Sequence, residues 1–361
     1  MKVYLWETKT SSEDISSGSS FWKRTILDPQ LSLYIPALQS MGHDPHGCIY
    51  DALRKPALDP KKATPTEKRE YTKAGKLYKN QRETDETPAE FHQRCLDAIA
   101  EKPDRYYARG IVVRLEEEVL EAAADVWNTA AQMREARRQL LHGKRRLQVY
   151  PRNPDSCMSW SRECDYLNVC AKMAAIDDPL LFQHEPEHVE LDEGEGNLSD
   201  DLSLLTQSSM RCYRSCQRKF YYRYVLRQRP LKKAETLSTG DSIHKALEMY
   251  RKTSGDLDAA KRALKTEDPF VRAKEEAMVV GYAARWGAPA GIVAVESQFR
   301  VPLINPETGA ASRTFALGGR VDAIVAVEAV GELMNPTLQV PGAGEENLEA
   351  QLEASIGGTG G

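Results

Sequence analysis

The chain opens with an alternating pattern of side chains that predicts a strand over residues 1–9. Val3 and Leu5 fall on one face of this strand, and Tyr4 and Trp6 fall on the other. Near the other end of the chain, residues 292–302 and 314–327 show the pattern of two further strands, separated by a turn at 305–309. The sequence therefore predicts strands at both ends of the region between residues 1 and 327.

Between these strands, the apolar positions recur at intervals of three and four, which is typical of amphipathic helices. Asp-Pro pairs are typical of helix starts and interruptions, and they stand at 28–29 and 268–269. Residues 56–88 are polar and proline-containing, and they predict a surface loop. The helices are predicted at 21–40, 110–143, 208–229, 238–252 and 257–286.

Composition changes at two places along the chain. Residues 184–203 form an acidic stretch that predicts a solvated linker. The Gly-, Glu- and Pro-rich residues 328–361 predict a flexible tail. We therefore divide the 361 residues into a first part, 1–183, and a second part, 204–327, which together could make one large domain or two ordinary ones.

Overall charge and apolar content exclude some classes of protein. The net charge of −4 means that any contact with nucleic acid must come from local basic patches. No run of 18 apolar residues occurs, so no membrane span is predicted, and the early charges argue against a signal peptide. Seven cysteines without a secretion signal argue against a disulfide framework. We expect a cytoplasmic protein.

Two acidic positions suggest metal-dependent hydrolysis. Glu7 and Lys9 share one face of the first strand because side chains alternate with a period of two. Asp322 lies within the apolar strand at 314–327, where an unpaired carboxylate would be costly. Hydrolysis of a phosphodiester requires a divalent cation held by oxygen ligands, with a group beside it that positions water.

Four further motifs accompany these residues. They are Gly240-x-x-x-His244, Gln30-x-x-x-Tyr34, Cys216-x-Arg-Lys-Phe-Tyr-Tyr222, and the cysteines Cys157, Cys164 and Cys170. Together with Asp322 and Glu7-x-Lys9, they resemble the RecB-type branch of the PD-(D/E)XK nuclease superfamily. The resemblance covers roughly two thirds of the chain.

The resemblance implies an α/β restriction-endonuclease-like core, a small mixed sheet flanked by helices, with added helical segments. It implies that His244, Asp322 and Glu7 hold Mg²⁺ or Mn²⁺ and that Lys9 is the catalytic lysine. Gln30 and Tyr34 would line the site, one helical turn apart. The expected activity is a DNA exonuclease in recombination, repair or phage DNA processing, in a bacterial or phage-infected cell.

The order of the motifs departs from that of the family. In the family, the helix with Cys216, the histidine and the aspartate come before Glu-x-Lys, Gln-x-x-x-Tyr and the cysteine cluster. Residues 1–183 therefore resemble the family's C-terminal half, and residues 204–327 its N-terminal half. This order indicates circular permutation, which exposed turns tolerate. It predicts that the strand of Glu7 pairs with the strand of Asp322, within one chain or between two.

The resemblance also implies a metal centre made of cysteines. Cys157, Cys164 and Cys170 would be joined by Cys216, with Cys212 as a possible substitute. Four thiolates suit a [4Fe–4S] cluster or zinc, and the spacing alone does not decide between the two. Free thiols that bind no metal are the third alternative. The resemblance favours iron–sulfur.

Residues 211–233 contain nine Lys or Arg and no acid, interleaved with aromatic residues. Basic side chains neutralise phosphates and aromatic rings stack on bases, so Arg218, Lys219 and Tyr222 are candidates for DNA contact. A solvated basic face over an aromatic core is the simpler explanation of the same pattern. The competing function is a catalytically inactive iron–sulfur or zinc protein of the same fold that binds DNA or acts as a scaffold. Protein partners are not indicated.

Overall fold

In a computed structural model, the chain folds around one mixed sheet, and the structure describes residues 1–159, 162–188, 191, 202–231 and 235–328. The six-stranded sheet has the order β3-β2-β1-β10-β7, and β9 also pairs with β10. β1 runs parallel to β2 and antiparallel to β10. Its strands are β1 (Lys2–Ser11), β2 (Pro45–Arg54), β3 (Tyr107–Val112), β7 (Ser203–Leu205), β9 (Ile292–Ile304) and β10 (Ala311–Val327).

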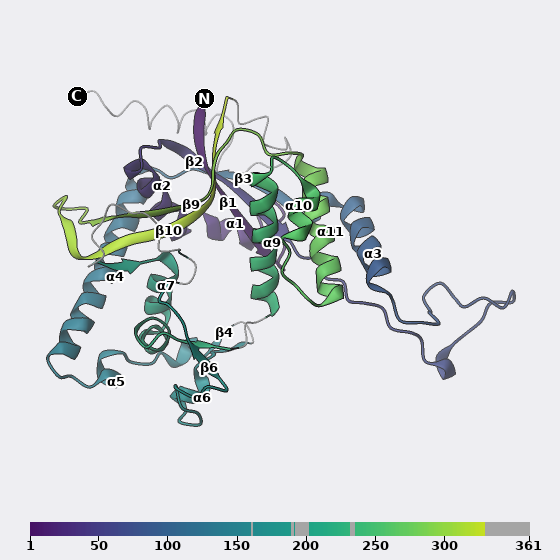
Figure 1. Cartoon of the computed structure of the whole chain (residues 1–361), viewed down its shortest axis with the longest axis horizontal. Helices are drawn as coiled ribbons and strands as arrows, with labels where there is room; N and C mark the ends of the chain where they lie inside the picture. The colour runs from purple at the N-terminus through teal and green to yellow at the C-terminus, as the bar shows by residue number, and fades with distance from the viewer. Residues whose placement is uncertain (160–161, 189–190, 192–201, 232–234, 329–361) are drawn as a thin grey trace.

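Helices cover both faces of this sheet (Figure 1). The α-helices are α1 (Ser20–Thr25), α2 (Pro29–Ser40), α3 (Pro88–Glu101), α4 (Glu116–Leu141), α5 (Arg146–Val149), α6 (Leu167–Cys170), α7 (Gln207–Ser215), α8 (Gln217–Phe220), α9 (Glu235–Lys252), α10 (Leu257–Arg262) and α11 (Pro269–Trp286). Shorter elements are the helical turns η1 (Thr66–Lys68), η2 (Pro103–Arg105), η3 (Pro154–Ser156) and η4 (Tyr221–Val225), and the small strands β4 (Met158–Ser159), β5 (Arg162–Glu163), β6 (Phe182–His184) and β8 (Gln228–Pro230). The expected small mixed sheet flanked by helices is confirmed.

The first strand and the last strand of the described chain lie side by side in the sheet. β1 pairs with β10 from Lys2 opposite Val327 to Trp6 opposite Ala323. The pairing predicted between the two halves of the chain is therefore confirmed, and it occurs within one chain. Neither strand is left with an open edge here, which removes a site of unwanted pairing.

The side chains of β1 alternate between two cores, as the sequence predicts. Leu5 is fully buried in a core shared with α2, α4 and α7. Tyr4 and Trp6 are buried on the opposite face, together with Ile49 of β2 and Val325 of β10. A further core joins α3, α9 and α11. β1 is thus fixed from both sides.

Two of the predicted helices are each divided in two: the helix predicted over 21–40 is α1 and α2, and the one predicted over 257–286 is α10 and α11, interrupted near the expected Asp268-Pro269. The Asp28 side chain accepts a hydrogen bond from the amide of Gln30, with Pro29 in the first turn, so α2 begins there. The Asp268 side chain likewise accepts from the amides of Phe270 and Val271 at the start of α11. A short polar side chain followed by proline starts a helix because it satisfies amides that lack an intrahelical partner.

Other predictions were wrong in their extent. The helix predicted over 110–143 begins at Glu116, because the residues up to Val112 belong to β3. The helix predicted over 208–229 is broken at Cys216, whose backbone is extended, and it ends in η4 and β8. β2 and α3 were not predicted. The loop predicted at 56–88 is confirmed, since only the short turn η1 and one isolated bridge lie within it before α3.

Most of the predicted acidic linker, namely 189–190 and 192–201, lies outside the described residues, as does the predicted tail from 329 to 361. In the described part of the chain, no helix combines the length and the apolar character needed to cross a bilayer.

Candidate active site

Glu7 and Lys9 contact each other directly on β1. The Glu7 side chain is buried, whereas Lys9 is about a third exposed (34%). Gln30 of α2 joins the pair: its Nε2 donates to Glu7 Oε1 at 2.9 Å, and its Oε1 accepts from Lys9 Nζ at 3.1 Å. The three predicted residues therefore form one hydrogen-bonded group.

Asp322 lies on the neighbouring strand, next to this group. The paired register of β1 and β10 ends at Trp6 opposite Ala323, and Glu7 and Asp322 are the next residue along each strand. The amide of Thr8 donates to Asp322 Oδ2 at 2.8 Å. The two carboxylates thus come from opposite ends of the chain and meet at one point of the sheet.

His244 reaches the same point from α9. Its Nδ1 lies 3.5 Å from Asp322 Oδ2. A Cβ atom at Gly240 would stand 3.3 Å from Thr10 Oγ1 of β1, so glycine lets this helix approach the strand closely. The spacing Gly240-x-x-x-His244 then carries the imidazole one helical turn further, beside Asp322.

Tyr34 lies beneath the site, buried against Phe299 with ring centroids 5.3 Å apart. Its hydroxyl interacts with Gln30. A Cβ atom at Gly319 would come within 2.5 Å of Phe299 and 2.9 Å of Tyr34. Glycine at position 319 is therefore required for the rings of Tyr34 and Phe299 to pack under β10.

Burial dominates the electrostatics of Glu7. Loss of solvent raises the pKa of Glu7 to about 7, against the lowering effect of Lys9. For Lys9, burial alone would lower the pKa, but the combined effects of Glu7, Tyr50 and Asp322 outweigh burial and raise the pKa above its usual value. Burial would raise the pKa of Asp322, yet the nearby His244 holds it well below its usual range. Burial likewise opposes the charged form of His244, and Asp322 outweighs it to raise the pKa of that imidazole.

Glu296 is a site residue that the sequence reasoning missed. Residues 295 and 297 of β9 pair with 323 and 321 of β10, so Glu296 lies opposite Asp322, on the side away from Glu7. Its backbone has a φ of +54°, which is strained for a glutamate. Its carboxylate binds Arg320 at 2.7 Å, and burial followed by the charge of Asp322 raises its pKa. Only the register across three strands reveals this row of carboxylates.

Arg251 of α9 was also missed. It is buried, donates to Thr8 Oγ1 at 2.5 Å, and lies over the Trp6 ring at 5.1 Å. It fixes the segment of β1 between Trp6 and Lys9 from the face opposite Glu7. A buried arginine at the end of a predicted amphipathic helix carries no sequence signal of its own.

The cysteine region lies away from the carboxylates, around α6, α7 and α8. All seven cysteines are free. The amide of Cys164 donates to the Cys157 carbonyl at 2.8 Å, and Asn153 contacts both Cys216 Sγ, at 3.4 Å, and Cys157 Sγ, at 3.7 Å. Burial raises the pKa of the Cys170 thiol. Among the described residues, no three of these thiols stand in an arrangement that could hold a metal ion. Cys212 is also within electrostatic reach of Cys216 and Cys164.

The predicted DNA contacts at 218–222 are only partly accessible. The expectation that Arg218 reaches solvent was wrong: it is buried, and its guanidinium donates to the carbonyls of Tyr150 and Leu147. Tyr222 is buried against Tyr166, so its ring is not offered to a base. Lys219 remains about a third exposed (30%), 3.9 Å from Asp165.

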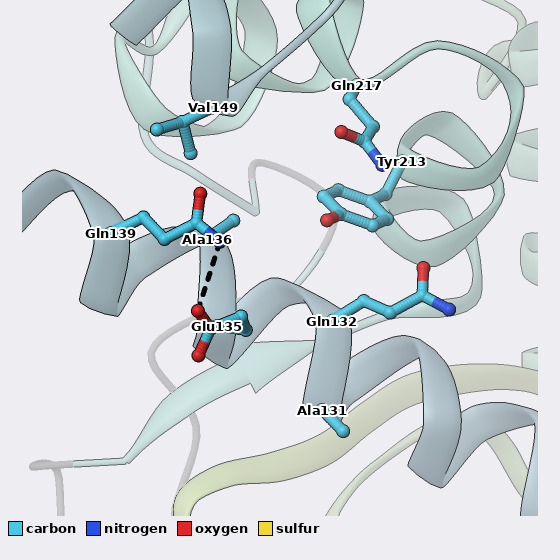
Figure 2. A pocket seen from close by; sticks show the side chains of 8 residues that line it. All are labelled: Ala131, Gln132, Glu135, Ala136, Gln139, Val149, Tyr213 and Gln217. Carbon is cyan, nitrogen blue, oxygen red and sulfur yellow. Dashed lines mark hydrogen bonds between the residues drawn. The ribbon is translucent and has the colours of Figure 1, made fainter. Parts of the chain in front are cut away.

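A surface hollow of about 400 Å³ lies between α4 and α7, apart from these residues. Figure 2 shows it lined by glutamine side chains and by Glu135, which accepts from Gln139 at 3.0 Å. It contains no nucleophile–base pair and none of the predicted site residues. We assign it no role.

Throughout the described residues, no three His, Cys, Asp or Glu side chains already stand in a metal-binding arrangement. In the carboxylate site, Glu7 Oε1 is engaged by Lys9 and Gln30, but Glu7 Oε2 is buried without a hydrogen-bond partner. A buried carboxylate oxygen without a partner is costly. Oxygen donors from Glu7 and Asp322 with an imidazole beside them are a set that suits a divalent cation.

Comparison with known families agrees with this geometry for the second part of the chain. Residues 204–334 match the family model of the PD-(D/E)XK nuclease superfamily. The mixed sheet flanked by helices is consistent with the restriction-endonuclease-like core of that superfamily. No curated protein and no solved structure matches the chain.

The matched PD-(D/E)XK segment begins within β7, the strand that pairs with β10, and it contains His244 and Asp322. β1, with Glu7 and Lys9, lies outside it. The part of the site that the match does not cover is therefore supplied by the first part of the chain, through the pairing of β1 with β10.

Proposed function

We propose that the protein is a metal-dependent nuclease that hydrolyses DNA phosphodiester bonds. The observation that carries the proposal is the convergence of Glu7 and Lys9 with Asp322 and His244, across the junction of β1 and β10. The PD-(D/E)XK match covers only Asp322 and His244. Each half alone lacks part of the set.

In this mechanism, Glu7, Asp322 and His244 would hold Mg²⁺ or Mn²⁺. When bound, the cation would activate water and stabilise negative charge on the phosphate. Glu7 would use Oε2, the oxygen without a protein partner. Lys9 Nζ, held by Glu7 and Gln30, would orient the attacking water, and Tyr34 would support Gln30.

The test is cleavage of single- and double-stranded DNA with Mg²⁺, by wild type and by the Asp322→Ala and Lys9→Ala variants. We expect each variant to lose at least about a hundredfold in rate and still to bind DNA. Matched controls are Glu121→Ala and Lys23→Ala, which remove an exposed acid and an exposed base. Undiminished cleavage by both site variants would refute the proposal.

We further propose exonuclease action in recombination, repair or phage DNA processing, on the basis of the RecB-type motifs. Linear DNA should then be degraded while covalently closed circles persist.

The competing function is a catalytically inactive DNA-binding protein. It gives no reason for keeping a buried carboxylate oxygen without a partner beside Asp322 and Lys9. Inactivity of the wild type with both metals would favour it.

We also propose a second metal centre in the same protein, held by Cys157, Cys164, Cys170 and Cys216. The proposal rests on their sequence motif, which resembles that of the iron–sulfur members of the family. Zinc remains the alternative occupant. The exposed Lys219 is a candidate DNA contact near this region.

The chain order supports circular permutation. The end of β10 at Val327 lies opposite Lys2 at the start of β1, and the two strands form an antiparallel pair. We therefore regard 1–183 and 204–327 as the two exchanged halves of one nuclease core.

A further inference from the structure

The segment from Lys61 to Glu86 projects from the body as an arm, and we call it the basic arm. Figure 1 shows it leaving the molecule beyond α3 and α11, between β2 and α3 in the chain. Its base is clamped: the amide of Lys61 donates to Glu86 Oε2 at 2.7 Å, and the amide of Glu86 donates to the Lys61 carbonyl at 2.9 Å. Arg94 of α3 holds the same carboxylate at 2.7 Å.

The arm has a defined conformation beyond its base. The amide of Thr64 donates to the carbonyl of Arg82 at 2.9 Å, which joins the two limbs. Near the tip, Tyr71 and Leu77 form an antiparallel bridge, and Gly75 takes a φ of +72° in the turn. The limbs therefore form an irregular hairpin.

The outer part of the arm is strongly basic in a chain that is acidic overall. Residues 68–82 contain six Lys or Arg and one Glu, whereas the whole chain has a net charge of −4. Lys62 pairs with Asp85, and Arg82 pairs with Glu90. No ion pair is recorded within the described chain for the four exposed lysines of the outer part, which are Lys68, Lys73, Lys76 and Lys79.

Two tyrosines are exposed among these lysines. Tyr71 is 53% exposed and Tyr78 is 48% exposed, although large aromatic side chains usually contribute to a core. A surface of unpaired lysines with accessible rings fits a nucleic acid, because the lysines neutralise phosphates and the rings stack on bases. An acidic protein would satisfy the lysines but would give no reason for the rings.

The segment that leads from β2 into the arm adjoins the end of β1. The amide of Lys55, six residues before the arm, donates to the carbonyl of Ser11 at 2.8 Å. Ser11 follows Lys9 by two residues on β1. A polynucleotide held at Glu7 and Asp322 would therefore leave the site beside the root of the arm.

We propose that the basic arm binds the phosphate backbone of the DNA whose scissile bond lies at Glu7 and Asp322. The inference rests on the proposed nuclease function and adds how the substrate is held. Each limb of about 13 residues can reach at most about 40 Å from the body. At 3.4 Å per base pair, contacts with the tip require about 12 base pairs beyond the site.

The test variant is Lys73→Gln/Lys76→Gln/Lys79→Gln. Its matched control is Lys144→Gln/Arg145→Gln/Arg146→Gln, which removes three exposed charges at the turn between α4 and α5, at the other end of the molecule in Figure 1. Binding to a 30-base-pair duplex is measured by fluorescence anisotropy in EDTA, over a series of salt concentrations. Thermal unfolding confirms that both variants fold.

We expect the arm variant to bind at least about tenfold more weakly at 0.1 M salt. The slope of log K against log salt should fall by up to about 2.7, since each phosphate contact contributes about 0.9. In cleavage assays, lengthening the duplex from 8 to 30 base pairs should improve kcat/KM for wild type and improve it much less for the arm variant. Tyr71→Ala/Tyr78→Ala should weaken binding to single strands, and Tyr71→Phe/Tyr78→Phe should restore it.

Equal losses in the arm variant and the control, or an unchanged salt slope, would overturn the proposal. If polyglutamate binds through the arm while DNA binding is unaffected by its variants, the partner is an acidic protein and the proposal also fails. Arm-dependent binding without any cleavage would retain the arm and reject the nuclease. Cleavage that does not depend on the arm would retain the nuclease function and reject the role of the arm.

Discussion

Replacing Asp51 should destabilise the protein strongly, because this residue is the acceptor for a buried hydrogen-bond network beside β1. Asp51 of β2 is fully buried and accepts from Arg109 Nε at 2.5 Å and from Arg109 Nη2 at 2.9 Å. It also accepts from Trp6 Nε1 at 2.9 Å and from the Tyr282 hydroxyl at 2.6 Å. Trp6 directly precedes Glu7, so the network fixes β1 where the site begins.

The loss in the free energy of unfolding follows from the buried groups that Asp51→Ala leaves without a partner. In Asp51→Ala, the buried Arg109 loses its carboxylate, and an uncompensated buried charge costs about 3–5 kcal/mol. The rings of Trp6 and Trp286, at 4.6 and 4.2 Å from Arg109, offset part of this cost. The unpaired donors of Trp6 and Tyr282 add to it. We expect a net loss of about 4 kcal/mol, a large share of a typical folding stability.

The assay is urea unfolding followed by circular dichroism. Asp51→Asn, which keeps one acceptor and the shape, should lose less than Asp51→Ala. Asp51→Leu/Arg109→Met should recover much of the loss, because no buried charge remains. The control Glu276→Ala breaks the partly exposed pair with Arg272 and should cost only about 0.3–0.5 kcal/mol. A loss below about 1 kcal/mol in Asp51→Ala would refute the reasoning.

Three shorter predictions concern the metal sites. Because burial raises the pKa of Glu7 to about 7, protons compete with the cation below that pH, so the Mg²⁺ needed for half-maximal cleavage should be about tenfold higher at pH 6 than at pH 8; no pH dependence would contradict it. Glu296→Gln removes a negative charge beside Asp322 and should raise that Mg²⁺ requirement about three- to tenfold, with DNA binding in EDTA unchanged; an unaltered requirement would exclude Glu296 from the site. Protein purified anaerobically should be brown, absorb near ~400 nm, and lose iron in Cys216→Ser. Zinc without iron would make this a zinc site, and the absence of both metals would rule out the centre.

The first strand, β1, could be predicted because its two faces pack against different cores. In β1, Leu5 faces the core of α2 and α4, whereas Tyr4 and Trp6 face the opposite side, so alternation is visible in the sequence. β2 has no such signal. It is buried on both sides, and its one acid, Asp51, resembles a surface residue until Arg109 is found beside it.

Breaks within helices and burial of single charges depend on tertiary contacts that a local pattern does not contain. Cys216 interrupts the helix predicted over 208–229, although the residues on both sides keep a helical pattern. Arg218 is one of a run of basic residues, which suggests a solvated face, yet its guanidinium has two carbonyl acceptors in and beside α5. The positions of Glu7, Lys9, Gln30 and His244 could be predicted, because motif spacing fixes them locally. The position of Glu296 could not, because it depends on the register of β9.

The placement of the site at a junction of the two halves has a physical consequence. Glu7 gains Asp322 as a neighbour only through the pairing of β1 with β10, and the amide of Thr8 is satisfied by the Asp322 side chain. Assembly of the site and pairing of these strands are therefore the same event. A chain in which this pairing is lost would leave Glu7 and Lys9 in one half and Asp322 and His244 in the other. The order of the motifs along the sequence is thus unimportant for the chemistry, provided that the sheet brings these two strands together.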